Sequence, residues 1–292
     1  VYKRQLLNSI AVPDVCAPCA SLAGLECSVD PHRHTDRGIS MRTTRTGIFA
    51  ATIAVVMAGA AVAATVDEAI GDPQRADANS ERDGARKPDQ VLPFIGLSEG
   101  DVVLDWGAGG GYWAELFSGV VGDSGTVYAH QNAGERFESQ KAALSEQFAP
   151  FGNIELLPLE RGAAIPLDDG SVDTIMISYL FHHMHYVDGS GESFPDSSAA
   201  LFAEFARVLK PGGTVIIIEH AAADGAGRAQ SGGWHRTPPQ MAKSDLQAVG
   251  YEFVADAPEI FHNPDDDLRN VWFEAGLQGK TTTFVHKYRM PE

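Results

Sequence analysis

The sequence contains very little cysteine, and all of it lies near the N-terminus. Cys16, Cys19 and Cys27 are the three cysteines among 292 residues. The chain after residue 27 has no cysteine and can form no disulfide there. The lack of free thiols suits an oxidising compartment without requiring one. Cys16 and Cys19, with His32 and His34 following, offer the donor types of a zinc site. Their spacing fits no common zinc pattern, so we expect no metal there.

Basic residues are also scarce. Lys and Arg total 22 against 39 Asp and Glu, which gives a formal net charge of −17. Such a chain gains no counterion-release affinity for nucleic acid and is repelled by anionic membrane surfaces. Because no basic run appears, we expect no nucleic-acid partner. The simplest consequence of the acidity is solubility.

Long hydrophobic runs are absent apart from one near the N-terminus, at residues 48–62. It is shorter than the about 20 apolar residues that a membrane-spanning helix needs. Basic residues at 41–47 precede it, and Ala61-Val62-Ala63 follows it. This order of parts predicts a secretory signal peptide, with an uncleaved membrane anchor as the weaker alternative.

These boundaries divide the chain into three parts. We interpret residues 1–40 as an upstream or non-native segment, 41–64 as the signal peptide and 65–292 as the mature domain. Cleavage near Ala63 predicts an exported protein, periplasmic or secreted, without stable membrane insertion. No interface pattern predicts its oligomeric state.

Strand and helix patterns alternate through the mature part. Continuous apolar runs are typical of strands covered on both faces, and we expect strands at 102–104, 126–129, 154–157, 172–178, 214–218, 251–254 and 283–288. Helical apolar spacing lies between them, for example at 112–121 and 133–148. Lys210-Pro211-Gly212-Gly213 is expected to end the helix before the fifth strand. The alternation predicts an α/β fold with a doubly wound, mostly parallel, seven-stranded sheet.

The clearest chemical signal directly follows the first strand, in Asp105-Trp106-Gly107-Ala108-Gly109-Gly110-Gly111. Glycines allow a sharp turn and let a ligand approach the main chain without a Cβ in the way. In a doubly wound sheet, such a loop faces the crevice where ligands bind. Asp105 is poorly placed for a pyrophosphate and well placed for a cationic or hydroxyl-bearing ligand. This favours S-adenosylmethionine (SAM) over NAD, and a turn without a ligand is the minor alternative.

At this loop the sequence resembles the class I SAM-dependent methyltransferases. Leu209-Lys210-Pro211-Gly212-Gly213 resembles the family's L-K-P-G-G element, and Ile165-Pro166-Leu167 resembles the approach to its fourth strand. Further segments, including Asp83-Gly84-Ala85-Arg86-Lys87-Pro88, resemble an exported bacterial subgroup of predicted methyltransferases. The resemblance implies a Rossmann-like methyltransferase fold and SAM as cofactor. It also implies an enzyme that methylates an acceptor, which we expect to be a small molecule.

The resemblance also indicates which residues hold the cofactor: Asp105, Gly107, Ala108, Gly109, Gly111, Gln131 and Glu160. Gln131 ends the second strand, where the family usually has an acidic residue that binds the SAM ribose hydroxyls. A neutral amide is a weaker acceptor than a carboxylate. Glu160 follows the third strand as a possible adenine contact.

Histidines follow the fourth and fifth strands: His182, His183, His185, His220 and His235. In a doubly wound sheet these strand ends face the ligand crevice. We predict that His182 and His220 are catalytic and that at least one removes a proton from the acceptor. Packing or capping is the competing role for each. These histidines could instead bind a transition metal with Glu219 or Asp224, but no spacing is tight enough, so no metal site is predicted.

Two other functions compete with methyl transfer. A non-catalytic SAM- or nucleotide-binding protein of the same fold is favoured somewhat by Gln131 and by export, because SAM is made in the cytoplasm. An NAD-dependent oxidoreductase would use a similar doubly wound fold, but Asp105 and the Lys210-Pro211-Gly212-Gly213 segment oppose it.

Overall fold

A computed structural model describes residues 63–184, 194–271, 273 and 276–291, all of which belong to one compact unit, Met57–Glu292. The cysteines, residues 41–62 of the expected signal peptide and His185 lie outside the described residues. Within the described part, no helix is long and apolar enough to cross a membrane.

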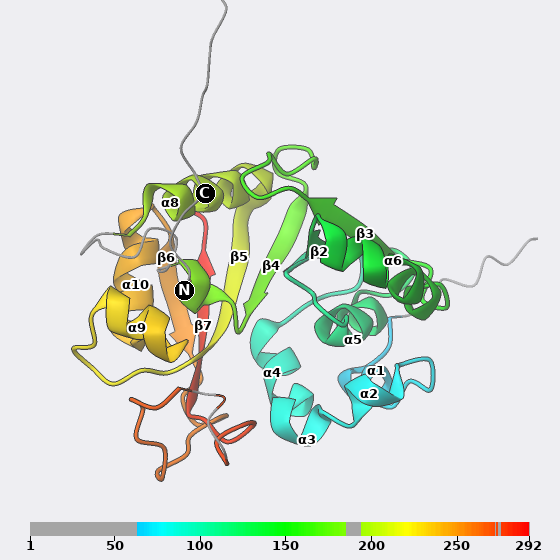
Figure 1. Cartoon of the computed structure of the whole chain (residues 1–292). Coiled ribbons are helices and arrows are strands. Elements are labelled where there is room, and N and C mark those ends of the chain that lie inside the picture. The colour runs from blue at the N-terminus through cyan, green and yellow to red at the C-terminus, as the bar shows by residue number, and fades with distance from the viewer. Residues whose placement is uncertain (1–62, 185–193, 272, 274–275, 292) are drawn as a thin grey trace, which may run out of the picture. The chain divides into compact units, whose positions relative to one another are not determined.

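Seven strands form one sheet in the order β3-β2-β1-β4-β5-β7-β6 (Figure 1). They are β1 Val102–Trp106, β2 Thr126–Asn132, β3 Ile154–Leu159, β4 Val172–Ser178, β5 Leu209–His220, β6 Glu252–Asp256 and β7 Thr283–Arg289. Neighbours from β3 to β5 are parallel, whereas β7 runs antiparallel to β5 and β6. This confirms the predicted mostly parallel, seven-stranded α/β fold.

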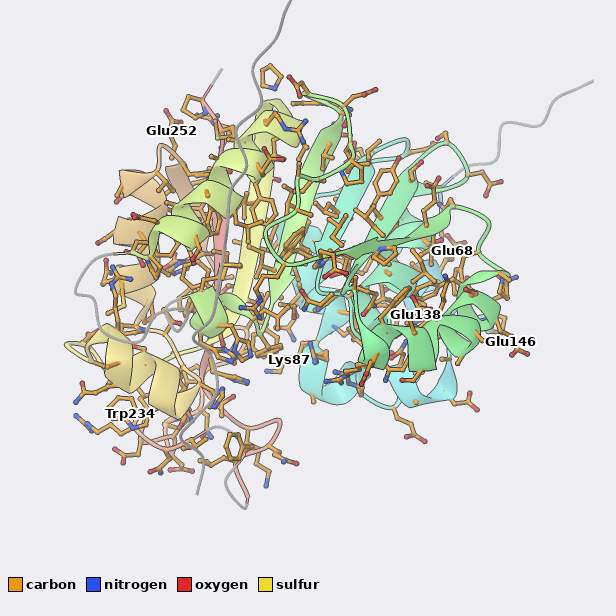
Figure 2. All side chains as sticks on the ribbon, turned by 45° about the horizontal axis from the view of Figure 1, so that its top comes forward. Glu68, Lys87, Glu138, Glu146, Trp234 and Glu252 are labelled. Carbon is orange, nitrogen blue, oxygen red and sulfur yellow. The ribbon has the colours of Figure 1, made fainter. Side chains whose placement is uncertain are left out.

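The described helices connect and cover these strands. They are α1 Val66–Ile70, α2 Asp77–Ser80, α3 Asp83–Arg86, α4 Pro88–Ile95, α5 Tyr112–Val121, α6 Glu135–Phe148, α7 Phe181–Met184, α8 Asp196–Val208, α9 Arg228–Trp234 and α10 Pro239–Ala248. On α6, the acidic side chains of Glu138 and Glu146 lie on the outer surface (Figure 2), while Phe137 and Leu144 are buried. Such one-sided burial is what the helical spacing of its apolar residues predicts.

The core has two parts because successive strand residues point to opposite faces of the sheet. Val103 packs with α4 and α5 on one face, and Leu104 packs with α8 and α10 on the other. Ile216 and Ile217 divide in the same way. Burying one such side chain contributes about 1.5–3 kcal/mol. The continuous apolar runs in the sequence therefore reflect strands that are covered on both sides.

One expected boundary is wrong. The Lys210-Pro211-Gly212-Gly213 segment does not only end a helix, because β5 already begins at Leu209, which pairs with Val172. The register then shifts before Thr174 pairs with Thr214. A Cβ at Gly213 would lie 2.9 Å from the Lys210 carbonyl oxygen, so the bulged entry to the strand needs glycine there.

Three short helices, α1 to α3, lie in the N-terminal arm, residues 65–87. Ion pairs and hydrogen bonds hold them: both terminal nitrogens of Arg75 contact Asp83 at 2.8–2.9 Å, and the Tyr112 hydroxyl donates to Asp83 at 2.8 Å. The arm is thereby attached to α5, the helix that follows the glycine-rich loop.

Candidate functional site

The glycine-rich loop lies between β1 and α5, at the point where the strand order turns from β2 to β4. This is the position at which open α/β sheets bind ligands. Gly107 has a φ of 79°, and a Cβ there would lie 2.1 Å from the Leu180 Cδ1 atom. Gly109 has a φ of 56°, but the nearest neighbour of a Cβ there is 3.9 Å away. The loop is therefore closed against Leu180 at Gly107 and open at Gly109.

Asp105 is the second-last residue of β1 and has an unusual environment. It is buried, and its Oδ2 atom has no hydrogen-bond partner. Burial raises the pKa of Asp105 to about 7, although the charge of Arg86 and the Ala114 N–H oppose the shift. An unpaired buried carboxylate oxygen is costly, so its presence beside an open loop points to a cationic or donor-bearing ligand.

Arg86 is a site residue that the sequence analysis did not identify. Its Nη1 donates to the Ser178 hydroxyl at 3.2 Å, and its guanidinium carbon lies 4.6 Å from the centre of the Tyr179 ring. The Trp113 indole also donates to Ser178, at 3.0 Å. Arg86 comes from α3, before β1 in the chain, and no spacing rule links it to the loop. Only the folded arm brings it there.

The end of β2 holds the loop from the other side. The Gly107 N–H donates to the His130 Nδ1 atom at 3.1 Å, and the His130 ring stacks on Trp106 with 3.6 Å between ring centres. Gln131 is buried, and its Nε2 donates to the Gly109 carbonyl at 2.9 Å. Gln131 is thus beside the loop, as predicted, and its amide nitrogen is hydrogen-bonded to the backbone of the loop.

The other predicted cofactor residues lie around the same loop, with one exception. The Ala108 N–H donates to the His130 carbonyl at 3.0 Å, and Gly111 precedes α5. Glu160 is exposed and follows β3, which is separated from β1 by β2. The structure therefore brings Asp105, the loop glycines and Gln131 together and places Glu160 one strand further out.

A cavity of about 370 Å³ lies at the carboxyl ends of β4 and β5. Arg86 and Tyr179 line it, together with further aromatic and imidazole rings, those of Phe261, Phe273, His182, His183, His220 and His235. Both histidines predicted to be catalytic therefore face one cavity, and Arg86 connects that cavity to the Asp105 side. His183 and His235, which were not in the predicted pair, face it as well.

Glu219 organises the inner histidines. The His182 Nδ1 atom lies 2.9 Å from the Glu219 Oε2 atom, and the backbone N–H groups of His182 and His220 also donate to this carboxylate. Burial raises the pKa of Glu219, but the neighbouring His182 and His220 rings and the hydrogen bonds from His182 lower it further, so the pKa lies below the ordinary value. The ionised carboxylate therefore places the Nδ1 proton on His182.

His220 has a different environment. Its Nδ1 atom lies 2.8 Å from the Thr281 hydroxyl oxygen, and its ring is 4.4 Å from that of Tyr179. Burial lowers the pKa of His220 to about 4, so the ring is neutral at pH 7. Burial also lowers the pKa of His183 to about 4 and that of His235 below its ordinary value. Neutral imidazoles can accept a proton or bind a metal ion.

The observed loop fits SAM. The buried Asp105 Oδ2 atom has no hydrogen-bond donor, and nothing lies within 4 Å of a Cβ at Gly110. SAM carries an ammonium group, a sulfonium and ribose hydroxyls, which can supply that partner. Arg86 offers a positive charge to a carboxylate on the same side.

Comparisons with known proteins match the part of the chain that contains this loop. Residues 104–217 match the family described as methyltransferase domain. The chain is 27% identical over 192 residues to the ubiquinone/menaquinone biosynthesis C-methyltransferase UbiE of Francisella philomiragia, covering 64% of this chain and 71% of that protein. It is 35% identical over 130 residues to the demethylmenaquinone methyltransferase of Lactococcus lactis, covering 44% and 46%.

A third relative is the protein-L-isoaspartate O-methyltransferase of Methanococcus maripaludis, 34% identical over 122 residues, covering 42% of this chain. The chain spans about half the length of the Lactococcus and Methanococcus proteins. A solved SAM-dependent methyltransferase from Aquifex aeolicus shares the fold with a TM-score of 0.51 and 22% identity, over 77% of this chain and 98% of that one. With the glycine-rich loop and the sheet order, these matches show that residues 104–217 are a methyltransferase domain with the fold of the class I SAM-dependent methyltransferases, whose cofactor is SAM.

Proposed function

We propose that the protein transfers the methyl group of SAM to a small, ring-shaped acceptor that carries a hydroxyl group. The observation that carries this proposal is the cavity that Arg86 and His220 line together with aromatic rings. Its volume of about 370 Å³ suits a small molecule. The names of two relatives, which methylate in quinone biosynthesis, support a quinone- or phenol-type ring.

The donor side consists of residues around the β1 end. Asp105, Gly109 and Gly110 would hold SAM, and Arg86 would bind its carboxylate. When bound, SAM supplies an electrophilic methyl group on a sulfonium. Since the reaction is an in-line displacement, the chain contributes mainly by holding donor and acceptor in contact.

The acceptor side consists of rings that can stack on a planar molecule. Tyr179 lies between Arg86 and His220, with its ring 4.6 Å from the guanidinium carbon and 4.4 Å from the imidazole. Phe261 faces the same cavity. A ring held against Tyr179 would therefore lie beside both the donor-side arginine and a neutral histidine.

His220 is the better placed of the two predicted bases. The Tyr179 ring lies between His220 and Arg86, whereas the His182 ring contacts the rings of His183 and His235. We assign His220 as the base that removes the proton of the acceptor hydroxyl. Loss of this proton makes the ring carbon beside that oxygen nucleophilic. Methyl transfer to that carbon would release S-adenosylhomocysteine. The ring carbon would then lose its own proton to water, while the ring oxygen takes back the proton held by His220.

The test is turnover with a panel of small hydroxylated quinones and phenols. Mass spectrometry would follow both S-adenosylhomocysteine and the methylated product. Product from at least one ring compound, and none from aliphatic acids or amines of the same size, supports the proposal. Tight SAM binding without turnover of any acceptor would favour a non-catalytic binding protein, the alternative suggested by the Gln131 amide. Binding of NAD in place of SAM would favour an oxidoreductase.

We also propose that the protein is exported. The basic residues at 41–47, the apolar run at 48–62 and the small residues through Ala63 support this. N-terminal sequencing of protein expressed in a Gram-negative host should find a new terminus near Ala64 in the periplasmic fraction. Cytoplasmic protein with an intact leader would contradict it.

A further inference from the structure

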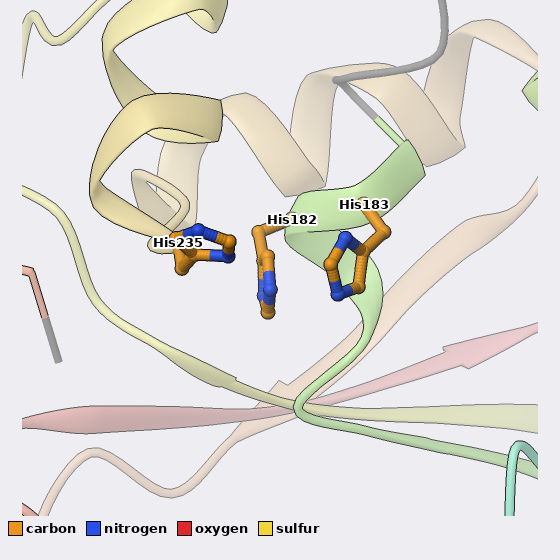
Figure 3. Close-up of side chains that lie close together, drawn as sticks. All are labelled: His182, His183 and His235. Carbon is orange, nitrogen blue, oxygen red and sulfur yellow. The ribbon is translucent and has the colours of Figure 1, made fainter. Parts of the chain in front are cut away.

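A second feature of the cavity plays no part in the proposed methyl transfer. His182 and His183 of α7 and His235 at the end of α9 present their rings to one another (Figure 3). One ring nitrogen of each lies within 4.8 Å of those of the other two. The ring centre of His182 is 4.2 Å from that of His183 and 5.1 Å from that of His235. The ring centres of His183 and His235 are 5.8 Å apart.

The middle ring is oriented by a buried carboxylate. His182 is 3% exposed and Glu219 is 0% exposed, and the two are joined by the 2.9 Å contact between Nδ1 and Oε2. With its proton on Nδ1, His182 carries a lone pair on Nε2. Histidines that bind metals usually donate their other ring N–H to a carboxylate or carbonyl in this way, which fixes the tautomer and orients the ring.

The third ring is held by an anchored backbone. His235 has a φ of 53°, a left-handed conformation that non-glycine residues adopt infrequently. The next residue, Arg236, is fully buried and forms two 2.9 Å hydrogen bonds with the Asp266 carboxylate. It also donates to the Ala221 carbonyl at 2.9 Å. These bonds hold the unusual backbone in place and so fix the position of the His235 ring.

We propose that His182, His183 and His235 bind a divalent transition-metal ion, with Glu219 holding the outer nitrogen of His182. Imidazole nitrogens are ligands for zinc, copper, iron and nickel. Three protein ligands leave a coordination position for water or another oxygen, as in catalytic rather than structural zinc sites. Because all three histidines line the cavity, that position faces the cavity, where the ion would attract an anionic oxygen of a bound molecule.

Zinc titration of the full-length chain without a histidine tag tests the proposal. After removal of metal with a chelator, calorimetry should show one zinc equivalent that His183→Ala and His235→Ala lose. His183 is exposed, so this variant should remain folded. Glu219→Gln should bind zinc about 10- to 100-fold more weakly, the usual effect of losing an outer partner, and the ligand variants should lose more than that.

His262→Ala is the matched control, because His262 is exposed and lies outside the cluster. Any zinc bound at Cys16 and Cys19 would persist in every histidine variant. Only the zinc equivalent that His183→Ala and His235→Ala lose is therefore assigned to the three histidines. Cobalt should give visible absorption bands in the parent protein that His183→Ala lacks. Equal zinc stoichiometry and affinity in the parent, His183→Ala and His235→Ala would overturn the proposal, as would a parent that binds no zinc. Neither measurement needs SAM or an acceptor. A negative result would therefore overturn the metal site without bearing on the proposed methyl transfer.

Discussion

At the scale of single residues, Asp105 combines a cofactor role with a cost to stability. Replacing it by Asn keeps the shape and removes the charge. A charge-assisted hydrogen bond contributes about 1.5–3 kcal/mol, so SAM affinity in isothermal titration should fall about 10- to 100-fold. Asp123→Asn, at an exposed turn, is the control and should bind SAM normally. Unchanged affinity in Asp105→Asn would exclude the assigned role.

The raised pKa of Asp105 also predicts how stability depends on pH. With a pKa of about 7 in the folded protein and about 3.9 in the unfolded chain, the folded state holds this proton more tightly between those values. This contribution to stability is therefore present at low pH and is lost as pH rises through 7. Melting temperatures at pH 5 and pH 8 should differ less in Asp105→Asn than in the parent. An equal difference in both would contradict the buried, unpaired carboxyl.

His220→Ala should lower turnover about 10²- to 10⁴-fold, the usual loss for a general base, while SAM affinity barely changes. Because the pKa of His220 is about 4, the parent rate at saturating SAM should stay flat between pH 6 and 8 and fall only as pH approaches 4. The control is His262→Ala, on the surface. A lowered melting temperature with a normal rate per folded molecule would make His220 a packing residue instead.

At the scale of elements, the Arg236–Asp266 pair connects the segment after α9 to the loop before β7. Both side chains are 0% exposed, so Arg236→Met should cost about 3–5 kcal/mol, because it leaves a buried carboxylate without its partner. The matched control is Arg289→Met, whose pair with Glu252 is 51% and 52% exposed and should contribute about 0–1 kcal/mol. Denaturant unfolding measures both. Similar losses in the two variants would contradict the structural role.

At the scale of the whole molecule, cofactor binding should stabilise the fold. A ligand at 100 times its Kd that binds only the folded state adds about 2.7 kcal/mol. For a unit of this size, 1 kcal/mol shifts Tm by about 2–4 °C, so SAM should raise Tm by about 5–10 °C. NAD at the same concentration should leave Tm unchanged. The opposite pattern would favour the oxidoreductase that the sequence analysis kept as an alternative.

The sequence by itself determined the seven strands, the helix after the first of them and the cofactor loop. Tyr112–Val121 and Val172–Ser178 have the observed bounds that their apolar patterns predict. The loop after Asp105 was identified because its glycines and the acidic residue are adjacent in the chain. Backbone conformation depends largely on neighbouring residues, so local patterns carry this information.

Only the tertiary structure decided which side chains meet. Arg86 reaches Ser178 because the arm folds onto α5, and His235 reaches His182 because α9 returns to the end of β5. Gln131 was predicted at the right place, but its amide bonds to the Gly109 carbonyl. The sequence shows no metal-site spacing because the ligands of the proposed site come from α7 and from the residue after α9. Such contacts depend on strand order and on loop paths, which no local pattern encodes.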